Sequence, residues 1–300
     1  MRRVIVGLGG AGVARVLMMP DPHGMARRAA RPPQTATITL PEIEWVPMDP
    51  QGTLEDSRLA AAQMAAAAVG CIVVLGGDGT VRAISQAVEE VPILALSTGT
   101  NNVLPTFLEP TVAGLAAGAV ARGRLELSAV AYRHKWLEVL VDQRPADRAL
   151  VDVALLRGRF VGARAIGDAS RLQALFVTRA DPATIGVSAI AGMLHPISPQ
   201  EPRGLAVWLG PEAERQTVAA LGPGLLVRVG AREIRDLAIG QAVEYPVTEP
   251  TVVALDGERE LALNGGQLLT VRLRSGGPWI VDGTRALHQV AALQDREPHR

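Results

Sequence analysis

Residues Cys71 to Asn102 read CIVVLGGDGTVRAISQAVEEVPILALSTGTNN, and this stretch carries the clearest structural pattern of the chain. Its first part, Cys71–Leu75, is a short β-branched apolar run that stops at two glycines, which is typical of a buried strand. Gly76-Gly77-Asp78-Gly79-Thr80 follows as the loop at the carboxyl end of that strand. Three glycines in four positions allow positive φ and expose backbone N–H groups, so the pattern predicts a loop that a phosphate chain can approach closely.

A helix, a second strand and a second polar loop follow the glycine loop. Thr80 opens the predicted helix Val81–Glu90, whose dipole would direct its positive end at an anion in the loop. Residues Pro92–Leu96 form the second apolar strand, and Ser97-Thr98-Gly99-Thr100-Asn101-Asn102 follows it. Two adjacent strands thus deliver two polar loops to one edge of an open α/β sheet. Ligands of such sheets bind at the carboxyl ends of the strands.

Length and composition indicate a globular protein with two domains. The chain has 300 residues, of which 48% are hydrophobic and 20% are charged, so it can bury two cores. The chain has 30 acidic and 30 basic residues, so it has no net charge that would attract it to nucleic acid or to an anionic membrane. The single cysteine, Cys71, excludes an internal disulfide and fits a reducing compartment. We therefore expect a cytoplasmic protein with a small-molecule substrate, and neither a nucleic acid nor a membrane as partner.

Two stretches of sequence resemble a membrane-spanning helix and a dinucleotide-binding motif, but their context argues against both. Residues Leu59–Gly77 are almost entirely apolar, but their many alanines and Gly70 favour a helix followed by a strand over a membrane span. Gly7-Leu-Gly-Gly-Ala-Gly12 satisfies the dinucleotide pattern G-x-G-x-x-G, yet Pro20 follows too soon for the helix of a Rossmann fold. We interpret Arg15–Met19 as a strand and the glycines as the turn between it and a preceding helix.

Local patterns predict the remaining elements. Thr53 and Asp56 frame the start of an Ala-rich helix, close to a capping box, and Thr111 caps another helix that runs to about Arg122. After that helix, short strand-like runs separated by turn residues predict a largely β second domain. These runs are Leu125–Ala131, Lys135–Val141, Ala149–Leu155, Leu172–Thr178, Gly204–Leu209, Leu225–Val229, Thr251–Leu255 and Leu268–Leu273.

Three features of the β region could carry chemistry. Asp152 lies in an apolar strand, where an isolated acid is usually an exposed residue of the polar face. The small-residue run Ile185-Gly186-Val-Ser188-Ala-Ile-Ala-Gly192 permits close approach of a ligand, and tight packing explains it equally well. Asp256-Gly257 between two strands is a strong hairpin pattern. A hairpin turn here is compatible with a functional role for Asp256 and Glu258.

Strand-GGDGT-helix-strand-TGTNN resembles the ATP-NAD kinase and diacylglycerol kinase superfamily. Within it, four segments resemble the branch of the acetoin catabolism protein X, often labelled ATP-NAD kinase-like. These segments are Arg15–Asp21, Ser97–Asn102, Ile185–Gly192 and Ala254–Arg259, and the resemblance covers most of the chain.

The resemblance implies the fold class α/β + β, with an NAD kinase-like two-domain fold. An N-terminal Rossmann-like α/β domain would span residues 1–123, and a C-terminal β-sandwich-type domain would span residues 124–277. The chain end, 278–300, would return to the first domain. We also expect a homo-oligomer.

The resemblance also implies an ATP-dependent kinase that phosphorylates a hydroxyl of a small nucleotide-type substrate, with NAD as the first choice and Mg²⁺ bound to the phosphates. Asp78 would accept the hydroxyl proton or hold the Mg²⁺, and Glu258 is the second catalytic candidate. The expected ATP-binding residues are Gly76, Gly77, Gly79, Thr80, Thr98, Gly99, Thr100, Asn101 and Asn102. The expected substrate-binding residues are Asp152, Gly186, Ser188 and Asp256.

The chain departs from the superfamily pattern at three places. NAD kinases carry an Asn-Glu pair where Val151 and Asp152 stand, so only the acid remains. Lipid kinases place an Asp where Val103 stands, which counts against a lipid substrate. No Asn-Pro-x-x-Gly segment precedes Gly7, so we expect that either the chain starts late or this phosphate contact is lost.

Other functions stay open beside the NAD kinase reading. The chain could phosphorylate another small metabolite linked to acetoin catabolism, act as a lipid-kinase-like enzyme, or serve as a nucleotide-binding regulator without catalysis. A Rossmann dehydrogenase is the remaining alternative. Lys135 is the only lysine and lies outside a GxxxxGK[ST] loop, which excludes a P-loop enzyme.

Overall fold

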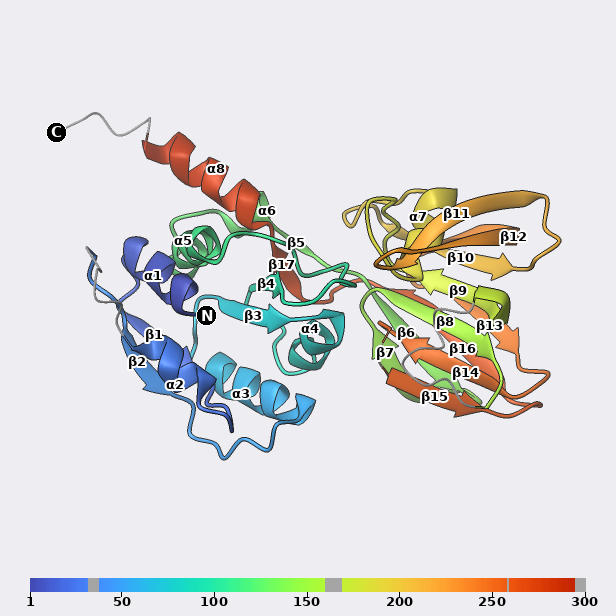
Figure 1. Ribbon diagram of the computed structural model, residues 1–300, viewed down its shortest axis with the longest axis horizontal. Helices are drawn as coiled ribbons and strands as arrows, with labels where there is room; N and C mark the ends of the chain where they lie inside the picture. Colours follow the sequence, from blue (N-terminus) through green and yellow to red (C-terminus); the bar gives the residue numbers. More distant parts are fainter. Residues whose placement is uncertain (32–37, 160–168, 258, 295–300) are drawn as a thin grey trace. The chain divides into compact units, whose positions relative to one another are not determined.

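The computed structural model describes residues 1–31, 38–159, 169–257 and 259–294. The chain divides into two compact units, which are treated separately here (Figure 1). The first unit comprises Met1–Thr98, Pro105–Tyr132 and Pro278–Arg300, and the second comprises Gly99–Leu104 and Arg133–Gly277. The segment from Pro278 onward therefore belongs to the first unit.

The first unit is an α/β structure with two sheets. Its helices are α1 (Arg2–Gly10), α2 (Met25–Ala30), α3 (Leu54–Ala66), α4 (Asp78–Ser85), α5 (Pro110–Ala121), α6 (Leu127–Val130) and α8 (Gly283–Gln294). Its strands are β1 (Arg15–Met18), β2 (Glu42–Trp45), β3 (Ile72–Gly76), β4 (Ile93–Ser97), β5 (Ala131–Arg133) and β17 (Trp279–Val281). One sheet has the order β1-β2 and the other β3-β4-β17-β5, and the pairs β1–β2, β3–β4 and β4–β17 are parallel.

Helices cover both faces of the β3-β4 sheet, with α5 and α8 on one side and α3 and α4 on the other (Figure 1). Side chains of α1, α5, α8 and β4 share one apolar core. The helices α1 and α5 approach closely because glycines face each other: a Cβ on Gly7 would lie 2.0 Å from the Thr111 carbonyl oxygen, and one on Gly114 would lie 2.2 Å from that of Val4. The interpretation of the early glycines as a turn is therefore wrong except for Gly12, which has φ 76° after the end of α1.

Local patterns identified most elements of the first unit. The capping box of Thr53 and Asp56 is confirmed at the start of α3. The α5 helix is capped by Glu109 instead of Thr111, because the Glu109 carboxylate accepts hydrogen bonds from two amides of the first turn. The strand predicted from Leu125 is wrong, since these residues form α6 and then β5. Across the described residues, no helix combines the length and apolarity needed to cross a membrane.

The second unit is built from two antiparallel sheets. Its strands are β6 (Trp136–Val141), β7 (Arg144–Ala149), β8 (Asp152–Arg157), β9 (Leu172–Val177), β10 (Arg203–Leu209), β11 (Arg215–Gly222), β12 (Leu225–Ala238), β13 (Ala242–Pro246), β14 (Thr251–Leu255), β15 (Arg259–Leu263) and β16 (Leu268–Arg274). The strand orders are β11-β12-β10-β9-β8-β14-β15 and β13-β16-β6-β7. The described part of this unit also contains a short helix, α7 (Ser188–Leu194), and a 3₁₀ turn, Ala169–Arg171.

Both faces of the larger sheet are covered at its central strand β8. Val153 and Leu155 of β8 pack against the smaller sheet, whereas Ala154 and Leu156 pack on the other side with α7. Alternate residues of a strand point to opposite faces, so a strand covered on both faces reads as a continuous apolar run. This explains why β8, β9 and β14 were recognisable in the sequence, while the polar edge strands β7, β11 and β13 were not.

Candidate functional site

The glycine loop leads directly from β3 into α4. Gly77 is the N-cap, and the helix begins at Asp78 instead of at Val81 as predicted. Asp78, Gly79 and Thr80 therefore form the first helical turn, in which the Thr80 amide donates to the Gly77 carbonyl at 3.1 Å. This turn carries the positive end of the helix dipole, which favours an anion.

The reason for glycine in this loop differs from the one expected. None of Gly76, Gly77 and Gly79 has positive φ. A Cβ on Gly76 would instead lie 2.7 Å from the Thr80 hydroxyl and 2.8 Å from its Cβ. Glycine at this position therefore lets the strand end pass tightly against the first turn of α4.

Asp78 and Arg82 are the buried charged residues of α4, with exposed fractions of 6% and 5%. They are four residues apart, so their side chains lie on the same face of the helix. A carboxylate in the first turn and a guanidinium in the last turn thus lie on one face of the helix that follows the glycine loop. Sequence reasoning missed Arg82, because a single Arg inside a short amphipathic helix belongs to no motif.

The second polar loop starts level with the first. The β3–β4 register pairs Gly76 with Ser97, so Gly77 and Thr98 leave the sheet at the same edge. Thr98, Gly99, Thr100 and Asn101 are exposed and Asn102 is half-buried. Residues Gly99–Leu104 belong to the second unit and Thr98 to the first. The loop therefore passes from one unit to the other.

In the second unit, Asp256 binds main-chain amides with its carboxylate. Its Oδ1 accepts from the amides of Leu150, Val151 and Asp152 at 3.1, 2.7 and 3.2 Å, and its Oδ2 accepts from Leu150 at 3.1 Å. The Asp256 amide donates in turn to the Asp152 carbonyl at 3.0 Å. Asp256 has φ 50°, in the left-handed region, as the first residue of a tight turn with Gly257. The side chain of Asp256 therefore fixes the backbone that carries Asp152.

A neutral histidine holds the same backbone from another side. His134 is fully buried, and its Nε2 lies 2.9 Å from the Leu150 carbonyl oxygen. Nε2 carries the proton there, because a carbonyl can only accept. The Thr178 hydroxyl donates to the same oxygen at 2.6 Å. Burial, with a further contribution from the charge of Arg179, lowers the pKa of His134 from 6.5 to about 3.

The pKa of His134 predicts a loss of stability in acid. As the pH falls from 6.5 toward 3, the unfolded chain binds a proton at this residue and the folded chain does not, so unfolding becomes easier. We expect the free energy of unfolding to fall by about 1.4 kcal/mol per pH unit from this group. Urea titrations between pH 7.5 and 4 measure the slope. His134→Gln keeps a donor without a titration and should flatten the slope, whereas the exposed His23→Gln should not; equal slopes for both variants would refute this origin.

Two of the other predicted substrate residues, Gly186 and Ser188, lie at the start of α7. Gly186 has φ 107°, which only glycine adopts without strain, and its amide donates to the Ala220 carbonyl at 2.9 Å. Ser188 begins α7, is 1% exposed, and its hydroxyl has no hydrogen-bond partner among the described residues. Asp152 is 5% exposed, so it is buried instead of lying on a polar face. Glu258 lies outside the described residues.

Lys135, the only lysine of the chain, is also buried in the second unit. Its ammonium group donates to the carbonyl oxygens of Ser198, Glu201 and Arg203. Desolvation lowers its pKa to about 8; the charge of Glu201 opposes this shift, and the charges of Arg179 and Arg203 add to it. The residue thus ties a surface loop to the start of β6 and has no part in a phosphate loop.

Known proteins resemble this chain over most of its length. Residues 10–125 match the ATP-NAD kinase N-terminal domain, and residues 135–276 match the acetoin catabolism protein X C-terminal domain. The acetoin catabolism protein X of Cupriavidus necator is 40% identical over 282 residues, which cover 90% of this chain and 78% of that protein. A crystal structure of yeast NADH kinase complexed with NADH has a TM-score of 0.57 at 15% identity, covering 100% of this chain and 85% of that one.

The yeast structure shows that the two units form an NAD kinase-like fold, which confirms the fold class expected from the sequence. The ATP-NAD kinase domain, which includes the glycine loop, makes the chain an ATP-dependent phosphotransferase. With 40% identity over most of both sequences, the chain belongs to the family of the acetoin catabolism protein X.

Proposed function

We propose that this protein transfers the γ-phosphoryl group of ATP to a hydroxyl of a small nucleotide-type substrate, with NAD as the acceptor and NADP as the product. The observation that carries the proposal is the buried carboxylate of Asp78 in the first turn of α4, directly after a glycine loop. Phosphoryl transfer requires donors for the phosphate oxygens and a group that positions the nucleophilic hydroxyl. The glycine loop would supply the donors, and Asp78 would supply the carboxylate.

The residues present suit Mg²⁺ as the companion of ATP. Mg²⁺ is usually held by one or two carboxylates together with substrate phosphates and waters, so it needs no protein cage. Asp78 would be one such carboxylate. Bound Mg²⁺ would neutralise charge on the phosphates, and Asp78 would orient the acceptor hydroxyl or take its proton.

The second polar loop and the backbone around Asp152 would hold the nucleotide groups. The side-chain amides of Asn101 and Asn102 both donate and accept, which suits ribose and phosphate oxygens. Asp152 would accept a hydrogen bond from a substrate hydroxyl, because Asp256 holds its backbone in place. The Val151 side chain is fully buried and apolar and cannot form a hydrogen bond, so a different acceptor hydroxyl is the second candidate. The yeast kinase of similar fold is complexed with NADH, which supports the choice of a nicotinamide nucleotide.

The test is to incubate the protein with ATP, Mg²⁺ and NAD and to measure NADP with an NADP-specific dehydrogenase. We expect NADP to form only when Mg²⁺ is present. ATP binding is measured separately by isothermal titration calorimetry. If ATP binds but no NADP forms, the acceptor is a different hydroxyl compound. It would then be identified by offering the protein a pool of metabolites and measuring the consumption of ATP. Absence of both ATP binding and ATP consumption would refute the kinase function.

A further inference from the structure

Arg179 follows strand β9 in the second unit, and its guanidinium is largely withdrawn from solvent. Only 14% of the side chain is exposed, and the buried Nε has no hydrogen-bond partner among the described residues. Nη2 lies 3.7 Å from the Asp181 carboxylate, which is too long for a hydrogen bond. Buried side-chain donors are nearly always hydrogen-bonded, so this guanidinium calls for an acceptor that a ligand can supply.

The Arg179 side chain lies on the face of the larger sheet that is covered by α7. Val177, two positions earlier, packs with α7 on this face. The chain stays extended beyond β9, because Thr178 and Ala180 both donate main-chain hydrogen bonds to neighbouring segments. Successive side chains of an extended chain alternate between the two faces of a sheet. Arg179 therefore shares the face of Val177.

Asp152 is a close neighbour of Arg179 on the same face. Asp152 stands directly opposite Val177 in the β8–β9 register, and Ala154, two positions further along β8, packs with α7. Arg179 is therefore the diagonal neighbour of Asp152 across the two strands. Diagonal neighbours lie about 7–8 Å apart, within reach of a long side chain. A substrate held by Asp152 can thus also contact the guanidinium.

Two other cations make the surroundings of Arg179 attractive to an anion. Extending the β9–β10 register by two residues places Arg203 opposite Arg179, and like charges in opposite positions destabilise a sheet. Arg203 is compensated by carboxylate oxygens of Glu201 and Asp236 at 2.9 and 2.6 Å. Desolvation, together with the charges of Arg179 and Arg203, lowers the pKa of Lys135. Arg179 has no carboxylate as close as those of Arg203.

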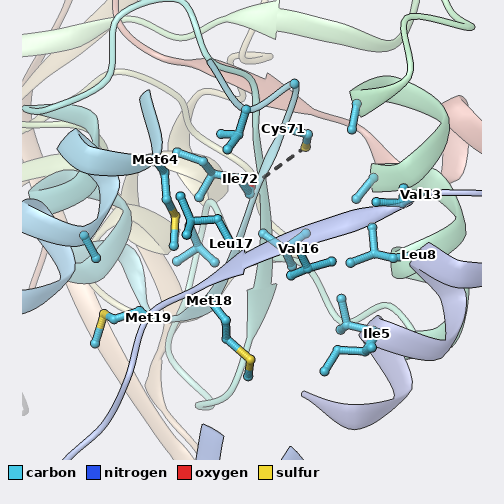
Figure 2. Close-up of a pocket in the computed structure, with 18 of the residues that line it drawn as sticks. Ile5, Leu8, Val13, Val16, Leu17, Met18, Met19, Met64, Cys71 and Ile72 are labelled. Carbon is cyan, nitrogen blue, oxygen red and sulfur yellow. Dashed lines mark hydrogen bonds between the residues drawn. The ribbon is translucent and has the colours of Figure 1, made fainter. Parts of the chain in front are cut away.

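A cavity in the first unit is of a different kind. It has a volume of about 760 Å³, and the side chains that Figure 2 labels around it are apolar or carry sulfur, among them Val16, Leu17 and Met64. Burying a charged group against such walls is costly, so they suit apolar groups. The surroundings of Arg179 are therefore the better place for an anionic group of a substrate.

We propose that Arg179 binds a phosphate group of the acceptor, so that the protein distinguishes nucleotides from nucleosides and other phosphate-free alcohols. An arginine side chain presents several N–H donors in one plane and binds phosphate through paired hydrogen bonds. The inference rests on the proposed function, in which the acceptor is held by Asp152. It makes a phosphate on the acceptor a requirement for tight binding, and in NAD this group is the diphosphate.

The test is isothermal titration calorimetry with NAD, after the ATP site has been saturated with a non-hydrolysable ATP analogue and Mg²⁺. We expect Arg179→Gln to weaken NAD binding by about 10- to 100-fold, which is the usual loss when hydrogen bonds between charged groups are removed. Arg179→Lys keeps the charge without the planar donors, so its affinity should lie between the two. Arg228→Gln, at an exposed position of the same unit, is the matched control and should bind NAD like the parent.

Two ligands that differ by one phosphate separate recognition from a structural role. We expect Arg179→Gln to weaken the binding of nicotinamide mononucleotide and to leave that of nicotinamide riboside unchanged. The affinity for the ATP analogue should be the same in both proteins, which assigns the phosphate to the acceptor and not to ATP. The melting temperature of the ligand-free protein should change little, because the buried Nε has no hydrogen bond to lose.

Initial rates connect the inference with the reaction. The KM for NAD should rise in Arg179→Gln while kcat changes little, as expected when binding is lost equally from the ground state and the transition state. If NAD binds through Arg179 and no NADP forms, the inference stands and NAD is not the acceptor. NADP formation with the same KM in both proteins would overturn the inference and leave the kinase function intact.

Three further results would contradict the role of Arg179. They are equal NAD affinities in the parent and Arg179→Gln, equal weakening of the mononucleotide and the riboside, and weakening of the ATP analogue alone. If the parent does not bind NAD, inorganic pyrophosphate is titrated under the same conditions. Binding of pyrophosphate that is lost in Arg179→Gln would support the inference, and binding that is absent or independent of Arg179 would overturn it.

Discussion

Asp78→Asn is expected to lower the rate of phosphoryl transfer by ~10²–10⁴-fold, which is the usual effect of losing a general base. The carboxylate is buried in the first turn of α4, and Asn has nearly the same shape. The substitution therefore changes the charge and the ability to take a proton more than it changes packing. ATP binding should persist, since backbone amides of the loop would still contact the phosphates.

The measurement is the initial rate of ATP-dependent product formation at saturating ATP and Mg²⁺. Circular dichroism and ATP titration show whether the variant folds and binds. Asp49→Asn, at an exposed position of the same unit, is the matched control and should keep the parent rate. A variant at position 78 with the parent rate would remove Asp78 from catalysis.

Asp256→Ala is expected to destabilise the second unit by at least about 3 kcal/mol. The carboxylate of Asp256 accepts from three consecutive buried amides, and a buried donor that loses its partner costs about 1–3 kcal/mol. The alanine would also have to adopt φ 50°, which a residue with Cβ adopts only with strain. The carboxylate of Asp256 also fixes the backbone at Asp152, which is the proposed substrate-binding residue. Substrate affinity should therefore fall as well.

Urea unfolding followed by tryptophan fluorescence measures the change in free energy. Asp256→Asn keeps one acceptor oxygen and tolerates positive φ, so it should lose clearly less stability than the alanine variant. Asp236→Ala removes an exposed carboxylate that pairs with Arg203 at the surface and should have little effect. Similar losses for the three variants would show that the amide contacts of Asp256 do not determine stability.

The sequence was most informative where the interactions are local. The glycine loop, the strands on either side of it and the capping box of Thr53 each involve residues within a few positions of one another, and their patterns identified them. Even there the start of α4 was placed three residues late, because Gly77 and Gly79 suggested a longer loop. Gly76 also lies so close to Thr80 that a Cβ would clash with it, a contact that helix propensity does not describe.

Contacts between distant residues could not be predicted. Asp256 reaches amides more than 100 positions earlier in the chain, so its sequence context shows only a turn. His134 and Thr178 meet at the Leu150 carbonyl through the pairing of several strands. The glycines of α1 match a dinucleotide-binding pattern by chance. Gly7 is needed because the backbone of α5 packs directly against it, which only the tertiary structure shows. In each case the residue is needed for a tertiary contact, which local sequence composition does not reveal.

The enclosure of Lys135 by three carbonyl oxygens has a practical consequence. With the only ε-amine 4% exposed and hydrogen-bonded, lysine-directed reagents should react with the folded protein only after the loop around Lys135 opens. Acylation of this single lysine, followed by mass spectrometry, would therefore report the rate at which this part of the second unit opens.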